Sequence, residues 1–122
     1  MDIFCKIINK EVPAEVVLEG EDWLAVKDIH PAAPVHILII PKKHIVGIAE
    51  IKEEKDAQLI GQLFVAANKV AKKLGLDEKG FRLIVNQGDY GGQLVPHLHI
   101  HLLGGKKLGT KITRGQDVYD AI

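Results

Sequence analysis

The chain has 122 residues, 47% of them hydrophobic, and its 16 basic and 16 acidic side chains cancel to a formal net charge of zero. A chain of this length can bury a real core, so we expect one domain over residues 1–122. The balanced charge argues against a broad nucleic-acid or membrane footprint, and no uncharged apolar stretch is long enough to span a bilayer. Cys5 is the single cysteine and the N-terminus lacks a signal-peptide pattern, so we expect a cytoplasmic protein with no nucleic-acid or membrane partner.

The first part of the chain predicts a short helix followed by three strands. Apolar residues from Ile3 to Ile8 have helical spacing, and Pro13 argues for the end of that helix. Val16 to Leu18 and Trp23 to Val26 flank a polar turn and predict a hairpin. Val35 to Ile40 is β-branched and nearly all apolar, which is typical of a central strand buried on both faces.

The second part predicts one long helix and two more strands. The helix should run from about Glu54 to Leu74 and end at Gly75. Its apolar stripe, which we expect to pack into the core, comprises Leu59, Ile60, Leu63, Phe64, Ala67, Val70, Ala71 and Leu74. Phe81 to Val85 is a further strand, and the last strand carries three histidines and ends at Gly104-Gly105. This order predicts an α+β fold with an antiparallel sheet and segregated helices, followed from residue 106 by a polar tail.

The most informative segment is the alternation of His97, His99 and His101 with aliphatic residues. Alternate side chains of a strand share a face, so the three imidazoles should line one side while the aliphatic residues pack into the core. Neighbouring imidazoles about 6.5–7 Å apart can flank one phosphate, and histidine can act as nucleophile or acid–base near neutral pH. The same alternation could instead present ligands to a metal ion, and spacing alone leaves both interpretations open.

A polar, glycine-rich loop from Asn86 to Gln93 precedes the histidines and favours phosphate over metal. Its glycines permit a close backbone approach, so successive N–H groups could form an anion-binding nest. Asn86 and Gln93 add neutral donors for the same phosphate.

The run His97-Leu98-His99-Ile100-His101-Leu102-Leu103 resembles the defining motif of the histidine triad (HIT) family. The surroundings resemble the HINT branch of that family, the histidine triad nucleotide-binding proteins. Segments outside the triad that carry this resemblance are Ile3-Phe4, Glu11-Val12-Pro13-Ala14, Asp28-Ile29-His30-Pro31, Ile40-Pro41-Lys42-Lys43-His44-Ile45, Gly91-Gly92-Gln93 and Gly104-Gly105. The resemblance implies a five-stranded antiparallel sheet with one long and one short helix, joined to a second copy in a continuous-sheet homodimer.

The resemblance also implies hydrolysis of the P–N bond of purine nucleoside phosphoramidates without a metal ion. His99 would attack the α-phosphorus to form a nucleotidyl-histidine, and the carbonyl of His97 would orient the His99 ring. His101 and His36 would contact the phosphate and help to protonate the leaving group.

The same resemblance implies residues that would bind the nucleotide. Asn86 and Gln93 would hold the α-phosphate, together with His99 and His101. Asp28 would accept hydrogen bonds from the ribose. The base pocket would be lined by Phe4, Ile7, Val26 and Ile29.

Two departures from the branch bear on specificity and on metal binding. Leu94 stands where a polar residue is common, which puts the leaving-group preference in question. Some bacterial relatives hold structural zinc through Cys-x-x-Cys and two histidines, whereas this chain offers Asp2, Cys5, His44 and His97. Structural zinc sites favour sulfur and nitrogen over aspartate, so we expect no metal here and keep those four residues as the alternative.

Two other functions remain open from the sequence. One is a nucleotide-binding regulatory module with little turnover. The other is hydrolysis of dinucleoside polyphosphates, as in another branch of the family.

Overall fold

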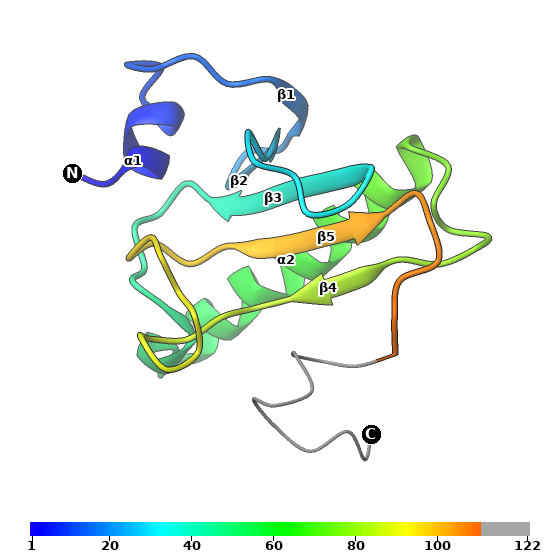
Figure 1. Cartoon of the computed structure of the whole chain (residues 1–122). Coiled ribbons are helices and arrows are strands. Elements are labelled where there is room, and N and C mark those ends of the chain that lie inside the picture. Colours follow the sequence, from blue (N-terminus) through cyan, green and yellow to red (C-terminus); the bar gives the residue numbers. More distant parts are fainter. Residues whose placement is uncertain (111–122) are drawn as a thin grey trace.

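The computed structural model describes residues 1–110, which form one antiparallel sheet between a long helix and a short one (Figure 1). The helices are α1 (Ile3–Ile8) and α2 (Glu54–Lys73), with a 3-10 turn η1 (Ile48–Glu50) between them in the chain. The strands are β1 (Val16–Glu19), β2 (Trp23–Lys27), β3 (Val35–Pro41), β4 (Arg82–Ile84) and β5 (Ile100–Gly104), in the spatial order β1-β2-β3-β5-β4. The predicted α+β fold with five strands is confirmed; the tail beyond residue 110 lies outside the described residues.

Strand β3 is buried on both faces, as its sequence predicts. Ile37 and Ile39 pack into the larger core under α2, whereas Leu38 and Ile40 pack with Phe4 of α1 on the opposite face. Antiparallel pairing places His101 of β5 directly opposite Leu38. His101 therefore lies on the face that carries α1, away from α2.

Helix α2 covers the other face with a narrower stripe than its sequence predicts. Leu63, Ala67, Val70 and Ala71 are buried as expected, joined by Ala66, but Phe64 is 47% exposed. The prediction that Phe64 packs into the core is wrong, because small alanines bring the helix close to the sheet and leave Phe64 on its flank. Within residues 1–110, no helix combines the length and apolarity that crossing a bilayer requires.

The last strand is shorter than the histidine pattern predicts. Only His101 lies in β5, while His97 and His99 belong to the extended segment before it. That segment follows a turn in which the His97 N–H bonds to Val95, and the Leu98 N–H then bonds to the carbonyl of Ile45 rather than to β3. Side-chain alternation nevertheless continues, since Leu98, Ile100 and Leu102 all pack into the core under α2.

Candidate active site

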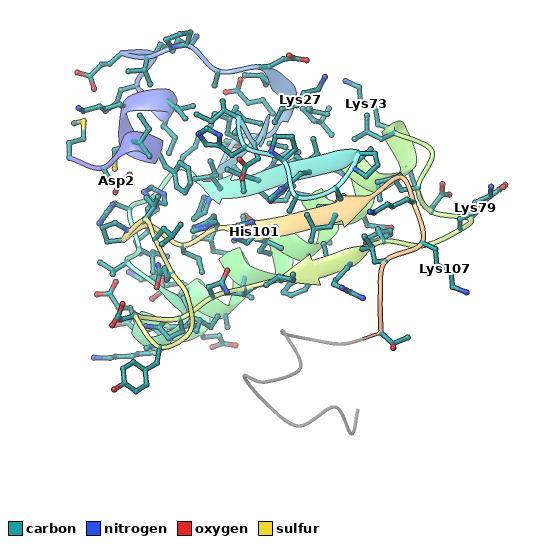
Figure 2. The ribbon with its side chains drawn as sticks, in the orientation of Figure 1. Asp2, Lys27, Lys73, Lys79, His101 and Lys107 are labelled. Atoms are coloured by element: carbon teal, nitrogen blue, oxygen red, sulfur yellow. The ribbon has the colours of Figure 1, made fainter. Side chains whose placement is uncertain are left out.

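A small pocket of about 180 Å³ opens beside the histidines on the α1 face of the sheet. It is lined by Phe4, Asp28, Leu38, Asn86, Gly92, Leu94, Val95, His99 and His101. Figure 2 shows His101 on β5 within this face. A larger hollow of about 710 Å³ lies between residues 75–80 and 105–107, but none of its lining residues is a histidine or cysteine.

His99 is held with one ring nitrogen toward the pocket. Its Nδ1 lies 2.7 Å from the backbone carbonyl of His97, and only 6% of the residue is exposed. A carbonyl can only accept, so Nδ1 carries the proton and Nε2 keeps a lone pair. Phe4 packs edge-on against the ring with centroids 4.9 Å apart, which fixes its orientation from the other side.

His36 and His101 form a second ordered pair next to His99. The Ala32 N–H donates to Nδ1 of His36 at 3.0 Å, so the proton of the neutral His36 ring must be on Nε2. That nitrogen lies 3.0 Å from Nδ1 of His101 and donates to it, which leaves the His101 proton on Nε2. The rings of His99 and His101 lie 4.8 Å apart, so one phosphate could contact both.

Burial keeps both pocket histidines neutral in the ligand-free protein. Burial lowers the pKa of His99 below its ordinary value and outweighs the hydrogen bond to His97, which acts in the opposite direction. Burial, with the neighbouring rings of His99 and His36, lowers the pKa of His101 to about 4. At neutral pH, His99 therefore has the unprotonated nitrogen that a nucleophile needs.

The glycine loop is built differently from the predicted anion nest. The N–H groups of Gly91, Gly92 and Gln93 all donate to carbonyls within the loop, so that prediction is wrong for them. A Cβ on Gly91 would lie 2.3 Å from the carbonyl oxygen of Gln87, and Gly92 has a φ of +80°, so the tight turn requires glycine at both positions.

The two loop amides that were predicted to bind phosphate have different environments. Gln93 donates its amide to the carbonyls of Val46 and Val95 and accepts from the Gly88 N–H, so its hydrogens are used and it holds the loop instead. Asn86 lines the pocket and donates one amide hydrogen to the Gly91 carbonyl. Its second amide hydrogen can be donated to a ligand.

The predicted nucleoside residues divide in a similar way. Phe4 and Asp28 line the pocket, and the Asp28 carboxylate lies 3.4 Å from Nε2 of His36. Val26 is 1% exposed in the core beneath Phe4, and Ile7 packs at the edge of that core, so neither lines the pocket. Ile29 is 86% exposed and also lies outside the lining residues.

Two lining residues, Leu38 and Val95, were not predicted. Leu38 lies opposite His101 and two residues from His36, so strand alternation could have identified it. Val95 and Leu94 form the wall next to the loop, and Leu94 is 93% exposed. The backbone donor Ala32 carries no sequence signal, because any residue but proline supplies an N–H.

A second cluster, behind the pocket, joins Asp2, Cys5, His44 and His97. His97 is fully buried and faces Pro41, whose carbonyl lies 3.0 Å from Nε2. The Nε2 proton is therefore donated to that carbonyl, and the lone pair on Nδ1 is directed into the cluster. The three triad histidines thus do not converge on one point among the described residues, which contradicts the interpretation of the triad as a set of metal ligands.

The spacing of the second cluster fits a tetrahedral metal ion. The six distances among Asp2 Oδ2, Cys5 Sγ, His44 Nδ1 and His97 Nδ1 all lie between 3.2 and 3.5 Å. The centre of such a tetrahedron lies about 2.0–2.1 Å from each corner, which matches zinc bonds to nitrogen and oxygen and is slightly short for sulfur. Direct charge-assisted hydrogen bonds would be shorter, about 2.7–2.9 Å.

A third group, Asp28, His36 and His101, is also close enough to share an ion. Its tautomers argue against metal binding, because the Ala32 N–H occupies Nδ1 of His36 and fixes a proton on the Nε2 that would have to bind the ion. We interpret this group as a hydrogen-bonded relay.

Comparisons with known proteins agree with this architecture. The HIT domain family model matches residues 9–108. An uncharacterised HIT-like protein of Synechococcus elongatus is 49% identical over 106 residues, covering 87% of this chain and 91% of that protein. The structure of a HIT family hydrolase from Clostridium thermocellum aligns with a TM-score of 0.88 at 54% identity, covering 92% of this chain and 96% of that one.

A histidine triad nucleotide-binding protein from Candida albicans aligns with a TM-score of 0.76 at 29% identity, covering 95% of this chain and 88% of that one. The family match therefore spans all five strands, α2 and the complete histidine run. With the sequence, fold and histidine geometry in agreement, the chain belongs to the HIT domain family.

Proposed function

We propose that this HIT protein hydrolyses the P–N bond of purine nucleoside phosphoramidates, as expected of the HINT branch, with His99 as nucleophile. The observation that carries this proposal is the bond from His99 Nδ1 to the His97 carbonyl, which leaves the Nε2 lone pair next to the pocket. The hydrolase from C. thermocellum and the nucleotide-binding protein from C. albicans are consistent with it, each by its name.

In the first step, Nε2 of His99 attacks the α-phosphorus and the P–N bond breaks, giving a nucleotidyl-histidine and an amine. The amine needs a proton, and His101 is placed to deliver it. A bound phosphate adds negative charge beside His101 and favours its protonated form. Asp28, 3.4 Å from His36 Nε2, can then accept the hydrogen that His36 gives to His101 in the free protein.

In the second step, water attacks the phosphorus, the P–N bond to His99 breaks, and the nucleoside monophosphate leaves. One proton of that water returns to His101, which is then protonated as it was in the substrate complex. His101 releases the proton that it took up from solvent on substrate binding when the monophosphate leaves. Asn86, with one amide hydrogen available, would hold a phosphoryl oxygen through both steps. No metal ion takes part in these two steps.

The size of the pocket agrees with a phosphate and ribose more than with a whole nucleotide. About 180 Å³ is below the usual range of 300–1,000 Å³ for small-molecule sites. The base would therefore extend over the rim, where Ile29 is exposed directly after Asp28. A 29%-identical nucleotide-binding relative supports this class of ligand.

A substrate panel tests the proposal. Adenosine and guanosine phosphoramidates should be hydrolysed without added metal, and dinucleoside polyphosphates should be poor substrates. His99→Ala should lower kcat/KM by on the order of 10³-fold or more. Unchanged turnover in that variant would eliminate the mechanism. Tight monophosphate binding with negligible turnover across the panel would instead identify a binding module.

We also propose a homodimer in which two sheets join at β4. This strand is at the edge of the described sheet, and an unpaired edge is a template for another strand. Phe64, Val65 and Val85 are each at least 36% exposed, so apolar surface accompanies the edge. Val65→Asp should shift light-scattering mass toward a monomer, whereas Gln58→Asp, which adds the same charge elsewhere on α2, should not; equal masses for both variants would contradict this interface.

A further inference from the structure

We propose that the hollow between residues 75–80 and 105–107 binds a small polyphosphate anion, at a site separate from the pocket that contains His99 and His101. The ligand is a chain of phosphates, either free tripolyphosphate or the phosphate chain of a nucleoside triphosphate. The site does not depend on the hydrolysis proposed above, because no residue of the histidine pocket lines this hollow.

The hollow has the size of a ligand site. Its volume of about 710 Å³ lies within the range of about 300–1,000 Å³ that is usual for small-molecule sites. A second hollow of about 280 Å³ adjoins it and shares Lys79, Gly80, Lys106 and Lys107 with it. Figure 2 shows Lys79 and Lys107 at the end of the molecule opposite Asp2. The two hollows together form one groove, which we call the lysine groove, lined by Gly75, Leu76, Glu78, Lys79, Gly80, Phe81, Arg82, Gly105, Lys106, Lys107 and Leu108.

The lysine groove carries positive charge that no carboxylate of the described chain neutralises through an ion pair. Lys79, Lys106 and Lys107 are exposed, and Arg82 is half-buried. The lysines that do form ion pairs within residues 1–110 are Lys27, Lys42, Lys43 and Lys55. Glu78 is the one carboxylate that lines the groove, against four cationic side chains. Because the whole chain has a net charge of zero, this local excess of positive charge favours an anionic ligand at this place.

Guanidinium and backbone donors add to the lysines. Arg82 donates one guanidinium N–H to the carbonyl of Gly109, and a guanidinium has further N–H groups for a ligand. The N–H groups of Lys106 and Lys107 donate to no backbone carbonyl within residues 1–110. Gly105, with a φ of +90°, makes the turn that carries these two lysines away from β5. Phosphate oxygens accept hydrogen bonds from all three kinds of donor.

The distribution of donors favours several phosphates over one. Four cationic side chains around the groove exceed the charge of a monophosphate, whereas a polyphosphate spreads comparable negative charge along a chain. The larger hollow has no aromatic lining residue, and Phe81 lines only the smaller one. Surfaces that bind single-stranded nucleic acid combine a basic groove with aromatic side chains on which successive bases stack. The lining therefore indicates a small polyphosphate and not a nucleic acid.

The first test locates the bound anion. The full chain, labelled with nitrogen-15, is titrated with sodium tripolyphosphate and followed by its amide resonances. We expect saturable shifts in residues 75–82 and 105–108, with one equivalent bound per chain. Shifts confined to residues 86–101 would place the anion in the histidine pocket and overturn the proposal. Phosphoramidate turnover is assayed separately, so its absence would leave this result unchanged.

Paired substitutions separate a site from general attraction between charges. Lys106→Gln combined with Lys107→Gln should weaken tripolyphosphate binding by on the order of tenfold or more, roughly the contribution of one hydrogen bond to a charged group. The matched control combines Lys52→Gln with Lys69→Gln, which removes two exposed lysines that line neither hollow. We expect the control to change the affinity by less than about twofold. Equal losses in the two double variants would overturn the proposal.

A panel of anions at one ionic strength tests the ligand class, with binding followed at the amides of residues 75–82 and 105–108. ATP should bind within severalfold of tripolyphosphate, because the phosphate chain makes the contacts. Orthophosphate and citrate should bind at least about tenfold more weakly, since each presents fewer phosphate oxygens to these donors. Citrate as tight as tripolyphosphate, ATP far tighter, or affinity for a single-stranded oligonucleotide that rises with its length would each contradict the assignment.

Discussion

The ring of His99 is oriented by the backbone of His97, two residues earlier in the same motif, through a 2.7 Å bond from Nδ1 to the carbonyl. His97 contributes through its main chain to the pocket and through its side chain to the cluster behind it. The histidine motif thus contributes to both the pocket and the cluster behind it, and His97 is the residue that the two sites share. The tautomers of His97 and His99 are set by backbone carbonyls, which can only accept a hydrogen bond.

The pH dependence of kcat/KM should reflect the depressed pKa of His99. Because burial favours the neutral ring, the nucleophile stays unprotonated below its ordinary pKa of 6.5. We expect the acid limb of a kcat/KM profile, measured with a phosphoramidate that does not titrate in the range, to lie below pH 6.5. An acid limb at or above that value would contradict the assignment.

Acid stability should depend on His101. Its pKa of about 4 in the folded chain is below the 6.5 of an ordinary histidine, so only the unfolded state gains a proton between these values. The free energy of unfolding should therefore be fully present above pH 6.5 and fall as the pH drops toward 4, by at most about 3 kcal/mol from this group. Denaturant titrations of His101→Asn should give a flatter profile over the same interval; a profile as steep as that of the wild type would contradict the assignment.

The N–H of Ala32 should matter although its side chain does not. Ala32→Pro removes the donor that fixes the tautomer of His36, whereas Ala32→Ser keeps it. We expect kcat to fall roughly tenfold in the proline variant only, as for a weakened acid–base relay. Equal kinetics in the two variants would show that this donor has no role.

Leu94 should influence leaving-group preference, since it is 93% exposed and lines the pocket. Leu94→Ser removes apolar surface worth about 1 kcal/mol of contact, or about fivefold in kcat/KM. We expect this loss for phosphoramidates of aromatic amines but not for those of small polar amines. Equal changes for both classes would show that Leu94 does not contact the leaving group.

The elements of the fold could be predicted because each has a strong local pattern. The apolar run of β3 and the period of α2 reflect burial directly, and His101 follows from strand alternation. The exposure of Phe64 could not be predicted, because the width of a buried stripe depends on how closely the helix approaches the sheet.

Two of the predicted site residues, Gln93 and Val26, have environments that tertiary contacts decide. Gln93 carries the right chemistry, but its amide is consumed by the carbonyls of Val46 and Val95, which only the folded loop brings near. Val26 is buried in the same core cluster as Phe4 and does not line the pocket. Residue type is visible in a sequence, whereas competition for hydrogen bonds is decided by tertiary contacts.

The most direct test of the mechanism is to trap the covalent intermediate. The protein is mixed with a labelled adenosine phosphoramidate, quenched within a turnover, digested under conditions that preserve phosphohistidine bonds, and analysed by mass spectrometry. We predict an adenylyl group on the peptide that contains His99, located on that residue by fragmentation and absent from His99→Ala. Full turnover with no adenylylated peptide, or with the label on another residue, would contradict the account.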